Sequence, residues 1–180
     1  IQKSDVYLEF EEIFSELKEV IESLGGGLIA ESVLLDEITN DPSLRNHIYF
    51  LLVIGNPFYR SKENANYGHR WFTEKKISES VEKALRTVYK SLSRDELVSE
   101  EEILARFRNE LIEIAGEHDE TVLKRWLQIS KDIASNPLGE WGNAASPNVR
   151  VKGIRDYAYL VVKRHGSPMH FREVAEEIEK

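Results

Sequence analysis

The chain of 180 residues is 41% hydrophobic and 31% charged and carries a formal net charge of −8, the composition of an ordinary soluble globular protein. It contains no cysteine, which excludes disulfides, thiolate catalysis and zinc sites with Cys ligands. No apolar run approaches the roughly 20 residues that cross a bilayer, so we expect no membrane partner, and the absence of cysteine fits a cytoplasmic protein.

The first 76 residues contain six segments with helical or strand periodicity. Apolar side chains recur at helical spacing from Tyr7 to Leu24, three glycines end that pattern, and Asp41 with Pro42 supplies an N-cap and a first-turn residue. The expected elements are, in chain order, a helix at 7–24, a strand at 28–29, a helix opened by Ser32, a helix at 42–52, and paired strands at 58–60 and 70–72. This is the element order of a winged helix.

Residues 77–148 repeat that order. The expected elements are a helix at 77–92, a strand at 97–98, a helix after a Ser99–Glu102 capping box, a helix from Asp119 to Ile133, and a wing-like stretch at 139–147. The pairs Asn56-Pro57 and Asn136-Pro137 follow the third helix of each copy. We therefore predict a mainly α-helical protein with small β-hairpins, formed by tandem winged helix-turn-helix units at 1–76 and 77–148. The alternative is one irregular helical domain without internal duplication.

The last segment, 149–180, differs from the rest in charge. It holds seven basic and five acidic residues, whereas 1–77 holds eight and thirteen, and 78–148 holds nine and fourteen. A cationic end on an acidic chain can meet a polyanion while the rest stays soluble and repels it. Apolar residues at helical spacing predict a helix that ends at Gly166 and a second helix after Pro168.

The sequence from Arg155 to Ile178, RDYAYLVVKRHGSPMHFREVAEEI, closely resembles the first two helices of the HARE-type helix-turn-helix. That winged-helix module also forms the N-terminal domain of the bacterial RNA polymerase delta subunit. The stretch from Asn136 to Gly142, an NP-x-GEWG pattern, is similar to one in C-terminal extensions of some bacterial sigma factors. The resemblance implies that 149–180 begins a third winged helix, cut before its recognition helix in a fragment of a longer polypeptide, and that RNA polymerase is a partner.

The sequence contains no pattern typical of an active site. Five histidines are scattered, the glutamates at 100–102 suit the first turn of a helix, and the glycines at 25–27 lack the Lys-Ser/Thr of a phosphate loop. No nucleophile motif is present. We therefore expect no catalytic residue, no metal, no cofactor and no small-molecule substrate, and a protein that is not an enzyme.

Cationic and amide side chains on the expected third helices, the hairpins and the last segment are the candidates for nucleic-acid binding. Arg and Asn can read base edges, and Lys and Arg can neutralise phosphates. The candidates are Arg45, Asn46, Arg60, Lys62, Arg70, Lys124, Arg125, Lys152, Arg155, Lys163, Arg164 and Arg172. For any one of them, a solvated position on an acidic domain is the open alternative. The three tryptophans are expected to pack in cores, with Trp141 the one that exposes its ring most.

Two classes of function stay open. The first is a non-enzymatic, transcription-associated module that contacts DNA, and the second is a module that docks on RNA polymerase or a transcription factor without touching DNA. The charge of −8 favours the second for residues 1–148, and the basic segment favours the first for the C-terminal unit. The expected partners are RNA polymerase and, on the first hypothesis, duplex DNA, at the nucleoid in the cytoplasm.

Overall fold

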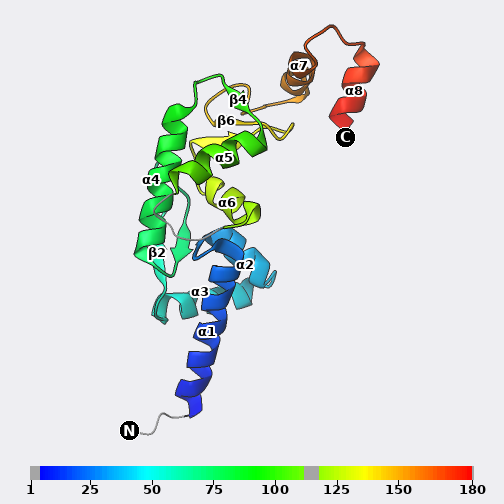
Figure 1. The fold of residues 1–180 in the computed structure, drawn as a ribbon. Coiled ribbons are helices and arrows are strands. Elements are labelled where there is room, and N and C mark those ends of the chain that lie inside the picture. Colours follow the sequence, from blue (N-terminus) through cyan, green and yellow to red (C-terminus); the bar gives the residue numbers. More distant parts are fainter. Residues whose placement is uncertain (1–4, 112–117, 180) are drawn as a thin grey trace.

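The computed structural model describes residues 5–111 and 118–179 as a mainly helical protein with two small sheets (Figure 1). The first half contains α1 (Asp5–Gly25), β1 (Leu28–Ala30), α2 (Glu31–Ile38), α3 (Pro42–Ile54), β2 (Tyr59–Ser61) and β3 (Arg70–Phe72). The second half contains α4 (Lys75–Ser91), β4 (Leu97–Val98), α5 (Glu100–Glu110), α6 (Glu120–Leu127), β5 (Ile133–Ser135) and β6 (Trp141–Asn143). Two helices follow, α7 (Ile154–His165) and α8 (Phe171–Glu179).

Both halves have the same strand arrangement. Each sheet has three antiparallel strands, ordered β1-β3-β2 and β4-β6-β5, so the last strand in the chain lies in the middle. In each half the first strand joins the sheet across two intervening helices, and the other two strands form a hairpin. The predicted mainly helical class with small hairpins is confirmed. The order helix, strand, helix, helix, strand, strand also occurs twice.

Local capping explains where several helices begin. The side chains of Asp41, Ser99 and Asp119 accept hydrogen bonds from backbone N–H groups at 2.8, 3.1 and 2.8 Å, as predicted. The prediction that Ser32 opens α2 is wrong, because β1 runs directly into the helix. Glu31 is already helical, and its N–H donates to the carbonyl of His69 at 2.9 Å.

The third helix of the second half is shorter than predicted. Helix α6 ends at Leu127, and Ile133 lies in β5. Asn136 occupies the turn between β5 and β6, where its side-chain oxygen accepts from the N–H groups of Leu138 and Glu140. Asn56-Pro57 instead lies between α3 and β2, so the predicted equivalence of the two Asn-Pro pairs is wrong. Apolar residues four positions apart occur along one face of a helix, and they also occur where a helix ends and a strand follows. Their spacing alone therefore does not distinguish the two structures.

The sheet β1-β3-β2 lies between two apolar clusters. Side chains alternate across its strands, so Leu28 and Phe72 face α4, α5 and α6, whereas Ile29 and Trp71 face α1, α2 and α3. Residues 1–76 and 77–148 therefore share an apolar core through this sheet. Trp141 is 1% exposed on the central strand β6, and the prediction that it shows its ring is wrong.

Trp126 of α6 connects the two halves. Its side chain is fully buried, and its indole N–H donates to the carbonyls of Gly25 at 2.8 Å and Leu28 at 2.9 Å. The neighbouring Arg125 donates to the carbonyl of Leu24 at 2.5 Å and pairs with Glu37 at 2.8 Å. These contacts hold α6 against the end of α1 and against β1, as its central position in Figure 1 illustrates.

His118 packs at the same junction and makes it sensitive to pH. Its ring centroid lies 4.6 Å from that of Trp126, and its Nε2 is buried without a hydrogen-bond partner among the described residues. Burial lowers the pKa of His118 below its ordinary value of 6.5, although Asp119 opposes the shift. As the pH falls, the unfolded chain therefore takes up a proton at this histidine before the folded chain does. The contribution of neutral His118 to the free energy of unfolding is complete above about pH 6.5 and declines as the pH falls below that value.

We therefore expect the melting temperature of His118→Phe to fall less than that of the unchanged protein between about pH 7 and pH 5. Differential scanning calorimetry across this range measures the difference. Equal falls in melting temperature for both proteins would show that the stability of the fold does not depend on His118 being neutral.

The last two helices pack mainly against each other. Figure 1 places α7 and α8 beyond the second sheet, at the opposite end of the molecule from the start of α1. Leu160 and Val161 of α7 are buried, whereas α8 contains no buried residue. Gly166 ends α7 in the left-handed conformation, with φ of 74°, which confirms the predicted C-cap.

Candidate nucleic-acid interface

Five cationic residues, located just before α7, on α7 and on α8, form the set that we call the cationic surface. They are Lys152, Arg155, Lys163, Arg164 and Arg172, and all five are exposed. Lys163 and Arg164 belong to the last turn of α7, where the helix dipole favours positive charge. Arg172 is in the first turn of α8, across the turn at 166–170, so the helical hairpin brings charges from both helices to one end.

Few ion pairs engage the cationic surface, although residues 152–179 also hold five acidic residues. Arg155 is 3.7 Å from Asp156 with a side chain 96% exposed, and Arg164 is 3.7 Å from Glu177. Exposed pairs at this distance contribute little and are screened by salt. Among the described residues, Lys152, Lys163 and Arg172 make no ion pair. Aromatic rings accompany two of them, since Lys163 lies over Tyr159 and Arg172 over Phe171.

Most of the candidates in the first half form ion pairs or hydrogen bonds with other residues of the protein. Arg70 is 2% exposed and paired with Glu82. Arg45 pairs with Asp36 at 2.5 Å and donates to the carbonyl of Thr39 at 3.1 Å. In the described part of the chain, Asn46 on α3 and Lys62 beyond β2 are exposed and have no side-chain partner.

Arg60 holds the edge of the first sheet rather than facing solvent. Its guanidinium donates to both oxygens of Glu31, at 2.6 and 3.0 Å, and lies near the rings of Tyr49 and Trp71. Burial opposes ionisation of Glu31, but the hydrogen bonds and charge of Arg60 outweigh it and lower the pKa of that carboxyl. The hydrogen bond that Arg60 donates to Glu31 in turn raises the pKa of Arg60. The pair therefore stabilises the fold at neutral pH and weakens as Glu31 is protonated in acid.

Of the two candidates on α6, Arg125 lies at the contact between the two halves, whereas Lys124 pairs within the second half. Lys124 pairs with Glu100 at 2.7 Å, and Arg125 is bound to Glu37 and Leu24. Beyond the helix, Lys131 pairs with Glu63 of the first hairpin and donates to the carbonyl of Asn64 at 2.9 Å. These cations bind carboxylates and carbonyls of their own chain, and α6 is packed against α1 and β1.

The outward side of α3 is apolar, a feature that was not predicted from the sequence. Phe50, Val53 and Ile54 are 59%, 56% and 51% exposed, and Leu44 is 46% exposed. A signal was present in the sequence, because Phe50 to Ile54 are five consecutive apolar residues. One helix face cannot bury five residues in a row, so some of them must face outward.

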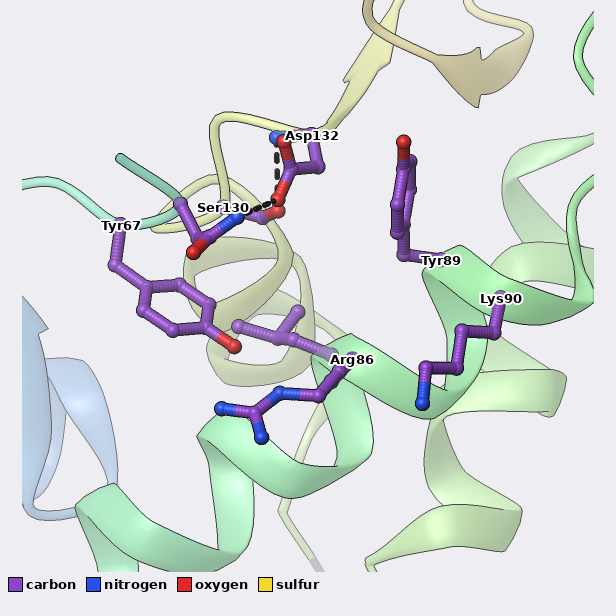
Figure 2. Close-up of a pocket in the computed structure, with 8 residues that line it drawn as sticks. Tyr67, Arg86, Tyr89, Lys90, Ser130 and Asp132 are labelled. Atoms are coloured by element: carbon purple, nitrogen blue, oxygen red, sulfur yellow. Dashed lines mark hydrogen bonds between the residues drawn. The ribbon is translucent and has the colours of Figure 1, made fainter. Parts of the chain in front are cut away.

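A cleft of about 290 Å³ opens where the first hairpin meets α4 and the start of β5 (Figure 2). The hydroxyl of Tyr67 donates to the carbonyl of Glu82 at 3.0 Å, and Asn66 donates to Asp132 at 2.8 Å. Figure 2 shows Arg86 extending toward Tyr67, whereas Lys90 points away from Asp132. The charged side chains that line the cleft do not point toward a common position. We therefore describe the cleft as part of the boundary between the two halves.

Neither a metal cluster nor a membrane-spanning helix occurs in the residues that the structure describes. Within 5–111 and 118–179, no group of three or more His, Asp or Glu side chains is placed to hold a metal ion. None of the helices in these ranges combines the length and apolarity that a membrane crossing requires.

Comparisons with models of protein families, with curated proteins and with solved structures found no match to this chain. The chemistry of the surface is therefore the basis for proposing a function.

Proposed function

We propose that this protein is a non-enzymatic, transcription-associated module that contacts duplex DNA through the cationic surface of α7–α8. One observation carries the proposal: residues 149–180 hold seven basic and five acidic residues, with Lys163, Arg164 and Arg172 exposed where α7 ends and α8 begins, whereas residues 1–148 hold 17 basic and 27 acidic residues. Lys and Arg on this hairpin can neutralise phosphates, and the acidic body keeps the rest of the duplex away.

We further propose that residues 1–76 and 77–148 are tandem winged-helix units. The repeated order of elements and the repeated strand order, with the last strand central, support this assignment. The third helix of such a unit usually enters the major groove. Here α3 is apolar outward and α6 is packed against α1 and β1, so DNA contact falls to α7–α8. The resemblance of this hairpin to the HARE-type module points to RNA polymerase as partner and the bacterial nucleoid as location.

A second function is favoured by the apolar outward side of α3. Exposed Phe50, Val53 and Ile54 suit contact with a protein better than contact with phosphates. On this alternative the chain docks on RNA polymerase or on a transcription factor and does not touch DNA.

A salt titration tests the proposed function. We expect the affinity of the full chain for a duplex of random sequence to fall steeply with salt, with a slope of log K against log salt of about −0.9 for each phosphate contacted. Fluorescence anisotropy with a labelled duplex measures it. Failure to bind at about 50 mM salt would remove DNA contact and leave protein docking.

A further inference from the structure

We propose that two carboxylates beside the second sheet, Asp95 and Glu140, restrain the α7–α8 hairpin and compete with DNA phosphates for two of its cations. We call this pair the acidic rim. A cleft of about 270 Å³ lies between the acidic rim and α7. Its lining residues are Asp95, Leu97, Glu140, Leu160, Lys163 and Arg164. The inference rests on the proposed DNA contact and gives that same surface an autoinhibitory element.

The acidic rim is held in place by buried polar side chains. The hydroxyl of Ser146, which is fully buried, donates to Oδ1 of Asp95 at 3.3 Å. The side-chain amide of Asn136, which is 5% exposed, donates to Oε2 of Glu140 at 2.9 Å. Within the described ranges neither carboxylate forms an ion pair. Both negative charges are therefore fixed in position by neutral donors, and both can attract a cation.

The cations on the other side of the cleft belong to the last turn of α7. Lys163 lies 6.0 Å from the ring centroid of Tyr159, and Arg164 is 3.7 Å from Glu177. In the part of the chain that the structure describes, neither cation pairs directly with the acidic rim. Opposite charges across an open cleft attract each other through water, and salt screens this attraction. A polyanion can therefore take the place of the carboxylates.

Few apolar contacts hold the hairpin in its place. Leu160 is 2% exposed and forms the apolar lining of the cleft with Leu97, but helix α8 contains no buried residue. The attraction across the cleft therefore has a large share in positioning α7. A phosphate that approaches Lys163 or Arg164 also comes near the acidic rim, and the like charge of the rim repels it.

The double variant Asp95→Asn, Glu140→Gln tests the competition. It removes both charges and keeps the oxygen atoms that accept hydrogen bonds from Ser146 and Asn136, so the fold should persist, as circular dichroism would verify. We expect it to bind a labelled duplex about fivefold more tightly than the unchanged protein at about 50 mM salt, measured by fluorescence anisotropy. The gain should diminish as salt is raised to about 200 mM, because screening weakens the repulsion.

A matched control makes the same change in net charge at a distant place. Glu16 and Glu19 are exposed on α1, which starts at the opposite end of the molecule from the hairpin (Figure 1). The variant Glu16→Gln, Glu19→Gln should gain less than about twofold in affinity, because salt screens charges at that distance. Equal gains in the two double variants would overturn the proposal, since net charge would then explain both.

The restraint on the hairpin can be measured without DNA. The chain contains no cysteine, so spin labels can be attached through Thr87→Cys on α4 and Ala175→Cys on α8, both at exposed positions. Pulsed electron paramagnetic resonance should give a narrow distribution of label distances at about 50 mM salt and a broad one at about 1 M. With the acidic rim neutralised, the distribution should be broad already at about 50 mM salt.

The two measurements separate failure of this inference from failure of DNA binding. If the unchanged protein and the rim variant bind the duplex equally well, the proposed function stands and the competition is overturned. If the unchanged protein does not bind the duplex, the proposed function fails, and the label distances alone decide whether the acidic rim restrains the hairpin. A narrow distribution in the rim variant at low salt overturns that restraint.

Discussion

The triple variant Lys163→Glu, Arg164→Glu, Arg172→Glu is expected to bind duplex DNA at least a hundredfold more weakly than the unchanged protein at low salt. Two of these residues end α7 and the third opens α8, so the reversal changes one compact surface by six charges. Three phosphate contacts become three repulsions, and the salt dependence of the remaining binding should be smaller by about 0.9 for each phosphate that is no longer neutralised. The change should not unfold the chain, because all three side chains are exposed and the ion pair that it removes within the described residues is the 3.7 Å pair of Arg164 with Glu177.

The control variant carries the same change in net charge at another place. Lys76, Lys90 and Arg94 are exposed residues on or beside α4, and their reversal to Glu should alter DNA affinity far less. Comparable losses in both triple variants would mean that net charge, rather than the cationic surface, governs binding. Full affinity in the α7–α8 variant would transfer the contact to the unchanged Lys152 and Arg155 or to the exposed Asn46 and Lys62 of the first half.

The second large effect is expected at the junction of the two halves. Replacing Trp126 by Ala should lower the free energy of unfolding by about 3–5 kcal/mol, the usual cost of removing a large buried aromatic side chain. Trp126→Phe should cost less, about 1–3 kcal/mol, because it mainly leaves the carbonyls of Gly25 and Leu28 without their donor. Urea denaturation followed by circular dichroism measures both.

The shape of the unfolding curve is as informative as its midpoint. Because the sheet β1-β3-β2 contributes to both apolar clusters, we expect residues of the two halves to unfold in one transition. Phe171→Ala, at a side chain 71% exposed, serves as the neutral control. Two separate transitions, of which Trp126→Ala shifts only one, would show that the halves are independent domains.

The local elements could be predicted from the sequence because their causes lie within a few residues. Asp41, Ser99 and Asp119 each cap the helix that follows them, and Gly166 ends α7 through its own backbone freedom. The first hairpin and the exposure of Lys163, Arg164 and Arg172 follow equally from local pattern and charge. The errors were also local, at places such as Ile133, where one spacing fits both a helix and a strand.

What the amino-acid sequence determined by itself is therefore the order of helices and strands, their caps, and the separation of charge between the acidic body and the last segment. Only the tertiary structure decided which cations remain available, because their partners are distant in the chain. Arg125 meets Glu37, which precedes it by 88 residues, and Lys131 donates to Asn64, 67 residues earlier. Periodicity reports which face of a helix is apolar, whereas packing of α6 against β1 depends on contacts that no short window of sequence contains.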